Sequence, residues 1–438
     1  MPRSVAHPEQ RGHDREILRL AVPAFLALVT EPLFLLADAA IVGHLGTPEL
    51  AALGIAGAVV QTAVGLCIFL AYGTTASVAR RIGAGDLRGA ITQGVDGVWL
   101  AVLIGVLTTT LGVMLTGPIV RVFNPDSSVE ADATTYLSWA WFGVTPLLIV
   151  LAATGILRGL QDTRTPLYVA VGGNIANVIL NLVLVYPVGL GIKGSAIGSV
   201  LAQVGMAVAL VLVVVRAARR EHAPLRPHGR GIARSARAGV ALVVRTLTLR
   251  ASLLVTTYAA ARLGSTDLAS HQLAITIWGF LAFALDAIAI AAQAITGRYL
   301  GAGDVAATRT VTDRMIRWGL LSGIVTGLAL AASSPFLGPL FTADDAVQEA
   351  LVPVLLVAAL FQPIAGVVFV LDGVLIGAGD GRFLAWAGVV VLLVFAPLAI
   401  ATSTLTWLWV AFGVGFMGGR LVVLLTRARG TDWMVTGA

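Results

Sequence analysis

Long runs without a charged residue indicate that much of this chain lies in lipid rather than in water. Four of these runs extend over Gly97 to Val120, Thr165 to Ile192, Gly194 to Val215 and Phe383 to Gly419. About 20 apolar residues in a helix are enough to cross the hydrocarbon core of a bilayer. Together with the turn signals between apolar stretches, these runs predict an all-α membrane protein with twelve transmembrane helices. The predicted spans are 17–43, 48–79, 88–116, 131–157, 165–186, 194–218, 234–262, 266–297, 305–332, 347–375, 382–402 and 404–426.

The composition excludes several classes of soluble protein and enzyme. Charged residues make up 12% of the chain, about half the share that covers a typical soluble domain. Cys67 is the one cysteine, so the chain has no internal disulfide and no CxxC metal or redox site. Lys193, the one lysine, is followed by Gly194, which excludes a P-loop. We therefore expect no enzyme activity, no catalytic residue, no bound cofactor and no metal site.

The basic residues predict the orientation of the chain. Its net charge of +6 would suggest nucleic acid in a soluble protein, but 24 of the 29 basic residues fall on one side of the predicted spans. Loops rich in arginine and lysine stay in the cytoplasm. The pattern thus predicts cytoplasmic termini, a cytoplasmic loop over 219–233 and no nucleic-acid partner. Arginine outnumbers lysine 28 to 1, which favours a bacterial source and hence the inner membrane.

An internal repeat predicts how the spans are grouped. Shifted by 218 residues, the sequence aligns with itself: Ile82-Gly83-Ala84-Gly85-Asp86 falls on Leu300-Gly301-Ala302-Gly303-Asp304. The repeat predicts two pseudo-symmetric six-helix lobes, 1–218 and 234–438, joined by a cytoplasmic linker over 219–233. Such a plan is common among transporters, with a site between the lobes and alternating access.

The Gly-Ala-Gly-Asp motif recurs at 83–86, 301–304 and 377–380, with Gly-Leu-Gln-Asp at 159–162. Each copy stands where a span reaches the cytoplasm. Glycine can adopt the left-handed conformation that ends a helix, and aspartate can cap the next one. We interpret the motif as structural, because four equivalent copies do not suit a catalytic site.

Acids inside the predicted membrane region are the strongest candidates for function. A carboxylate at the bilayer centre costs about 3 kcal/mol, so an acid retained there is a functional candidate. Glu31 and Asp38 lie seven residues apart on one face of the first span, and Pro23 and Pro32 interrupt that span. In the second lobe Leu249 and Thr256 occupy the equivalent positions. We therefore predict that Asp38 couples transport to a cation, with Glu31 in the cavity and both prolines as bends.

Further polar residues mark each half of the chain. Asn174, Asn177 and Asn181 form one stripe on the fifth span, which suits either a polar cavity or hydrogen bonds between helices. In the second half, Asp286 and Asp372 could bind substrate or pair with an arginine within a span, such as Arg250 or Arg420. The sequence leaves both readings open.

The chain resembles the MATE (multidrug and toxic compound extrusion) transporters, and more closely their DinF-like branch. The resemblance is carried by the runs Pro32 to Gly46, Leu157 to Thr163 and Asp372 to Gly377. It implies two six-helix lobes in a V and a proton- or sodium-driven antiporter. Asp38 matches the family's first-helix acid and Pro23 its bending proline; Tyr136, Asn177 and Ser199 match cavity residues of archaeal members. Asn181 stands where those members have a second Asp, and Thr154 where they have Asn.

Because Asn181 replaces the second Asp of those members, Asp38 is the one clear acid left in the first lobe, which favours proton coupling through Asp38. We predict an antiporter, working as a monomer in the lipid bilayer, that exports small organic compounds, chiefly amphipathic cations, in exchange for protons. The alternatives are sodium coupling, efflux of organic anions bound by Arg250 and Arg420, and a flippase for a lipid-linked precursor. A scaffold without transport activity would need an ordered soluble domain, for which the loops are too short.

Overall fold

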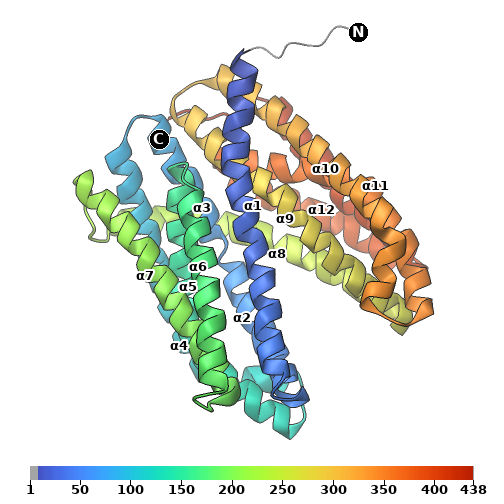
Figure 1. The fold of residues 1–438 in the computed structure, drawn as a ribbon. Helices are drawn as coiled ribbons and strands as arrows, with labels where there is room; N and C mark the ends of the chain where they lie inside the picture. Colours follow the sequence, from blue (N-terminus) through green and yellow to red (C-terminus); the bar gives the residue numbers. More distant parts are fainter. Residues whose placement is uncertain (1–7, 438) are drawn as a thin grey trace. The chain divides into compact units, whose positions relative to one another are not determined.

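The described part of the chain, residues 8–437 of a computed structural model, is helical, and no strand occurs in it (Figure 1). The first six spans comprise α1 (Pro8–Gly43), α2 (Thr47–Leu66) with α3 (Phe69–Gly83), α4 (Leu87–Val122), α5 (Ser127–Gly159), α6 (Arg164–Val185) and α7 (Gly191–Arg220). The last six comprise α8 (Gly229–Leu263), α9 (Ser265–Gly301), α10 (Val305–Phe341), α11 (Asp345–Gly377), α12 (Gly381–Ile400), and a final span made of α13 (Leu405–Ala411), the π-helix η1 (Phe412–Gly418) and α14 (Gly419–Arg429).

All twelve predicted spans are confirmed as helices of membrane length. Their ends differ from the prediction where proline lies inside a helix. Helix α4 continues through Pro118 to Val122, and α10 continues through Pro335 and Pro339 to Phe341. Proline is tolerated in membrane helices because neighbouring groups satisfy the backbone it disrupts. The predicted second span is not continuous, since it breaks at Cys67 and Ile68.

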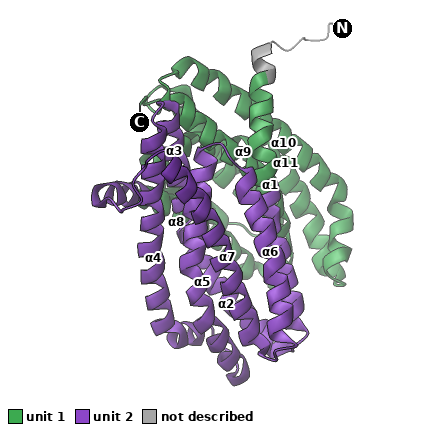
Figure 2. Cartoon of the chain, turned by 60° about the vertical axis from the view of Figure 1, so that its left-hand side comes forward, with its two compact units in different colours: residues 1–25, 240–438 green, residues 26–239 purple. Residues whose placement is uncertain are grey.

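The chain divides into two compact units (Figure 2). Unit 2 comprises residues 26–239, and unit 1 comprises the chain up to Phe25 and from Val240 onward. The division by packing therefore passes through α1 and α8. The division by repeat, with its linker over 219–233, stays a prediction.

Each unit is built around one central helix. In unit 2, α5 packs against α2, α3, α4 and α7; in unit 1, α11 packs against α9, α10 and the last two spans. Gly319, Gly323 and Gly327 form a stripe on α10, and a Cβ atom at any of them would collide with backbone of α11. Small residues at this spacing let membrane helices approach closely.

The Gly-Ala-Gly-Asp turns have the predicted left-handed residue, and their aspartates cap the next helix except at Asp380, which makes no cap hydrogen bond and pairs with Arg427. Gly85, Gly303 and Gly379 have φ angles of 77°, 77° and 76°, and Gln161 takes the same conformation at 63° in the fourth copy. Asp86 and Asp304 accept hydrogen bonds of 2.8 Å from the N–H groups of Gly89 and Ala307. The Gly89 N–H group, together with Arg81, holds the pKa of the Asp86 carboxyl below its ordinary value.

Candidate functional site

A chain of polar contacts in unit 2 centres on Asp38, whose side chain is 4% exposed. Asn181 Nδ2 on α6 and Ser195 Oγ on α7 each donate a hydrogen bond of 2.7 Å to Asp38 Oδ1. The Tyr136 hydroxyl on α5 lies 3.5 Å from Asp38 Oδ2. The carboxylate thus receives three uncharged donors from three different helices.

The contacts continue along the asparagine stripe of α6. Asn181 Nδ2 also donates to Asn177 Oδ1, and Asn177 Nδ2 donates to Ser199 Oγ, both at 3.0 Å. Gly198 allows this approach, because a Cβ atom there would overlap Asn181 Oδ1. That oxygen is buried and has no hydrogen-bond partner among the described residues.

The electrostatics of this site are unusual for a buried acid. Buried carboxylates are normally paired with a cation. No arginine, lysine or histidine of the described residues forms a salt bridge with Asp38. A group of three or more His, Cys, Asp or Glu side chains able to hold a metal is also absent from the described residues. Within the described residues, the charged carboxylate is therefore stabilised by hydrogen bonds rather than by a counter-charge.

The structure brings Asp38, Tyr136, Asn177, Asn181 and Ser199 together, as well as Ser195, which the sequence analysis missed. Ser195 lies one helical turn before Ser199, and that spacing was the available signal. Other candidates lie outside this network. Asn174 donates to the Thr30 carbonyl at 3.2 Å, Thr154 is half-buried, and Glu31 is exposed. Helix α1 runs unbroken through Pro23 and Pro32, so the interruption predicted there is not seen.

Unit 1 contains a second buried cluster, formed by Asp372 and two arginines. Arg245 on α8 contacts Asp372 Oδ2, and Arg420 Nη2 on α14 lies 3.2 Å from Oδ1. The three side chains are 8 to 12% exposed. Two guanidinium groups and one carboxylate leave this cluster with a net positive charge. A cavity of about 10 Å³ beside it has room for about one water.

This cluster shows which arginines contact Asp372. The sequence left open whether Asp372 binds substrate or pairs with an arginine such as Arg250 or Arg420. In the structure Arg420 pairs with Asp372, whereas Arg250 is exposed. Arg245 is one of the 24 basic residues on the predicted cytoplasmic side, and its side chain is buried against Asp372, a contact that the sequence analysis did not predict. Asp286 lies half-buried on α9.

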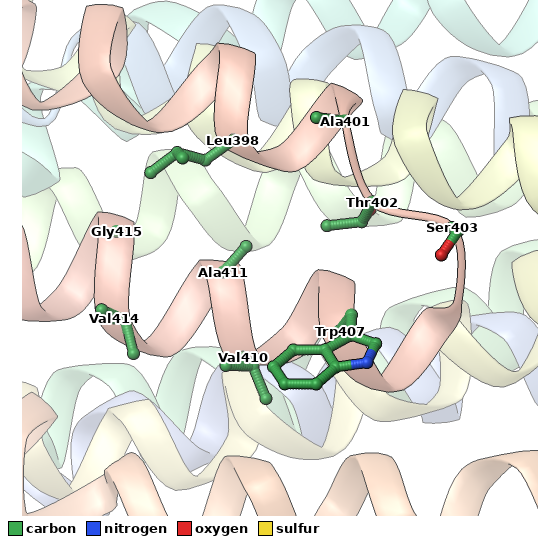
Figure 3. A pocket seen from close by; sticks show the side chains of 9 residues that line it. All are labelled: Leu398, Ala401, Thr402, Ser403, Trp407, Val410, Ala411, Val414 and Gly415. Carbon is green, nitrogen blue, oxygen red and sulfur yellow. The ribbon is translucent and has the colours of Figure 1, made fainter.

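A larger hollow of about 410 Å³ lies between α12 and the α13–η1 segment (Figure 3). Figure 3 shows Leu398, Trp407, Val410 and Val414 around it, with Thr402 and Ser403 at one end. It contains no titratable side chain, and Trp407 is 63% exposed. We assign it no part in coupling.

Comparison with known proteins identifies the family. A family model described as MatE matches residues 23–183 and 241–418. The Arabidopsis thaliana protein named Protein DETOXIFICATION 44, chloroplastic, is 32% identical over 93% of this chain and 80% of its own length. The Escherichia coli K12 protein named DNA damage-inducible protein F is 27% identical over 92% of this chain and 89% of its own length.

A solved structure supports the same fold. A mutant of the Vibrio cholerae MATE transporter VcmN superposes with a TM-score of 0.88 at 18% identity, covering 97% of this chain and 99% of its own. The twelve apolar helices make the chain a multi-pass membrane protein. The resemblance inferred from the sequence is thereby confirmed: the chain belongs to the MatE family, that of the MATE multidrug and toxic compound efflux transporters.

Proposed function

We propose that this protein is an antiporter that exports amphipathic organic cations in exchange for protons, with Asp38 as the proton-binding group. The observation that carries the proposal is the burial of Asp38 among uncharged donors only. A carboxyl group without a counter-charge in a place of low polarity can bind either a proton or a cationic substrate. Competition between these two for one carboxylate is the simplest basis of antiport.

The hydrogen bonds suggest how the site responds to a proton. As a carboxylate, Asp38 accepts from Asn181 and Ser195. Once protonated, it has an O–H group that needs an acceptor. A half-turn of the Asn181 amide would present Oδ1, which has no partner in the described structure, in place of Nδ2. Such a rearrangement would in turn alter the contacts with Asn177 and Ser199.

The remaining features of the proposal follow from the sequence. Bending of α1 at Pro23 or Pro32 would connect the state of Asp38 to substrate release. We assign Glu31, Thr154, Asn174 and Asp286 to the substrate path. The arginine pattern supports a bacterial inner membrane with both termini in the cytoplasm. We expect a monomer whose partners are the lipid bilayer and small organic molecules, with an ion gradient in place of a cofactor.

The Asp372 cluster favours one second candidate, the efflux of an organic anion. Its net positive charge could be neutralised by a carboxylate or phosphate group, which arginine binds through two parallel hydrogen bonds. In this scheme Arg245 and Arg420, rather than Arg250, would hold the substrate. Sodium coupling has less support, because Asn181 supplies an amide where a second carboxylate would strengthen a sodium site.

The proposal is tested by efflux from proteoliposomes under separate proton and sodium gradients. A panel should contain organic cations and organic anions, with wild type compared with Asp38→Asn. We expect cation efflux driven by the proton gradient and its loss in Asp38→Asn. Efflux that the proton gradient drives equally in both proteins would refute the role of Asp38. Export of the anions alone, blocked by Arg420→Gln, would favour the second candidate.

A further inference from the structure

Residues 216–237, which join α7 to α8, form the most basic stretch of the described chain. Within these 22 positions the only acid is Glu221. All seven arginines are exposed: Arg216, Arg219, Arg220, Arg226, Arg230, Arg234 and Arg237. We call this stretch the arginine segment.

The arginines are ordered by the two helices that carry them. Arg216, Arg219 and Arg220 have i, i+3, i+4 spacing on the last turns of α7, so they share one face. Arg230, Arg234 and Arg237 have i, i+4, i+7 spacing on the first turns of α8. The segment therefore presents two stripes of positive charge at the ends of two membrane-length helices.

The arginine segment is held firmly on unit 2. Ala218 and Ala223 are buried in a core formed by residues of α3, α4, α5 and α7. Trp99 Nε1 donates to the Leu225 carbonyl at 3.0 Å. The His228 N–H donates to Asp96 Oδ1, also at 3.0 Å. The charged stripes thus belong to a folded connection and have a fixed spacing.

These seven arginines differ from three other arginines near helix ends in having no salt-bridge partner in the described part of the chain. Arg81, Arg314 and Arg427 form salt bridges with aspartates at the ends of other helices. None of the seven arginines forms a salt bridge within residues 12–437. Clusters of four to eight basic residues directly beside a membrane helix attract anionic headgroups. The α8 stripe also lies at a helix N-terminus, where the backbone favours anions.

We propose that the arginine segment is a binding site for the headgroups of anionic phospholipids, with the α8 stripe as its core. Guanidinium groups bind phosphate oxygens through paired hydrogen bonds. Helices α7 and α8 are 30 and 35 residues long, which exceeds the about 20 residues that cross the hydrocarbon core, so their ends would extend to the level of the lipid phosphates. The site is independent of the transport activity proposed above.

The test removes the α8 stripe with the triple variant Arg230→Gln, Arg234→Gln, Arg237→Gln. Full-length protein in neutral detergent is titrated with cardiolipin or phosphatidylcholine, and bound lipid is counted by native mass spectrometry. Each arginine near an anionic surface is worth roughly fivefold in affinity, so we expect the variant to bind cardiolipin roughly a hundredfold more weakly. Phosphatidylcholine binding should not change.

Two matched variants make the result specific. Arg164→Gln, Arg309→Gln, Arg382→Gln removes three exposed arginines scattered over other helix ends and should keep cardiolipin binding within about threefold. Replacing the stripe by lysine keeps the charge and should restore most of the affinity. Equal loss in the scattered variant, or unchanged binding in the stripe variant, would overturn the proposal. Displacement of cardiolipin by inorganic phosphate at equal concentration would also overturn it, since the site would then bind free phosphate.

Discussion

The geometry of the Asp372 cluster predicts that substituting Asp372 destabilises the protein much more than substituting Arg420. Asp372 is shared by Arg245 and Arg420. Asp372→Asn would remove the carboxylate charge that these two buried guanidinium groups share. Arg420→Gln would instead leave one neutral pair, Arg245 with Asp372. The aspartate should therefore matter much more for stability than Arg420.

The geometry sets the size of the difference. At 3.2 Å between Arg420 Nη2 and Asp372 Oδ1, with an effective dielectric constant of about 20, one attraction amounts to about 5 kcal/mol before desolvation is counted. Breaking a buried ion pair by removing one partner costs about 3–5 kcal/mol in measured cases. We expect this loss for Asp372→Asn, and about 1 kcal/mol or less for Arg420→Gln, because removal of its buried charge offsets the lost attraction.

Thermal unfolding followed by tryptophan fluorescence measures both variants in detergent. For a unit of this size each kcal/mol lowers Tm by roughly 2–4 °C, so Asp372→Asn should lower it by roughly 10 °C and Arg420→Gln by roughly 3 °C or less. The exposed acid of Asp345→Asn is the control. Adding Arg420→Gln to Asp372→Asn should recover part of the loss. If Arg420→Gln lowers Tm more than Asp372→Asn does, the charge balance argued here is wrong.

Three further predictions concern single contacts. Ser195→Ala removes one of the two 2.7 Å hydrogen bonds to Asp38. Because a hydrogen bond to a charged group is worth about 1.5–3 kcal/mol, proton-driven efflux should fall at least tenfold. The variant Ser195→Thr keeps the hydroxyl group and should restore efflux. Gly323→Val forces a side chain against the backbone of α11 and should lower Tm by roughly 3–10 °C, whereas Gly54→Ala, at an open position, should have no such effect. Asp86→Ala removes a helix cap worth about 1 kcal/mol. Because the folded pKa of Asp86 is depressed, this contribution is present at pH 7 and is lost as the pH falls below about 4, where the Tm difference between Asp86→Ala and wild type should disappear.

The sequence predicted the helices well, because the apolar runs that lipid requires are long and easily recognised. The prediction was less accurate where local backbone geometry determines where a helix ends or breaks. Proline inside α4 and α10 looked like a helix end, and nothing in the apolar second span marked the break at Cys67. The π-helix of the last span lies in a glycine-rich run whose hydrogen bonding no pattern specifies.

The candidate site was predicted in part. Asp38 and the asparagines stood out because polar residues are costly in an apolar helix. Ser195 did not, since a single hydroxyl among small residues is common in membrane helices. The contact of Arg245 with Asp372 was not predicted, because Arg234 and Arg237 precede Arg245 on the same helix and only the fold shows which of these arginines faces Asp372.

Proton release on substrate binding tests most directly whether Asp38 is the group that exchanges a proton for substrate. Purified protein in weakly buffered detergent solution is mixed with an organic cation such as ethidium, and a pH-sensitive dye reports released protons. Wild type and the exposed-acid control Asp345→Asn should release protons in proportion to bound cation, and Asp38→Asn should release none. Equal proton release from Asp38→Asn and wild type at the same cation occupancy would contradict the account.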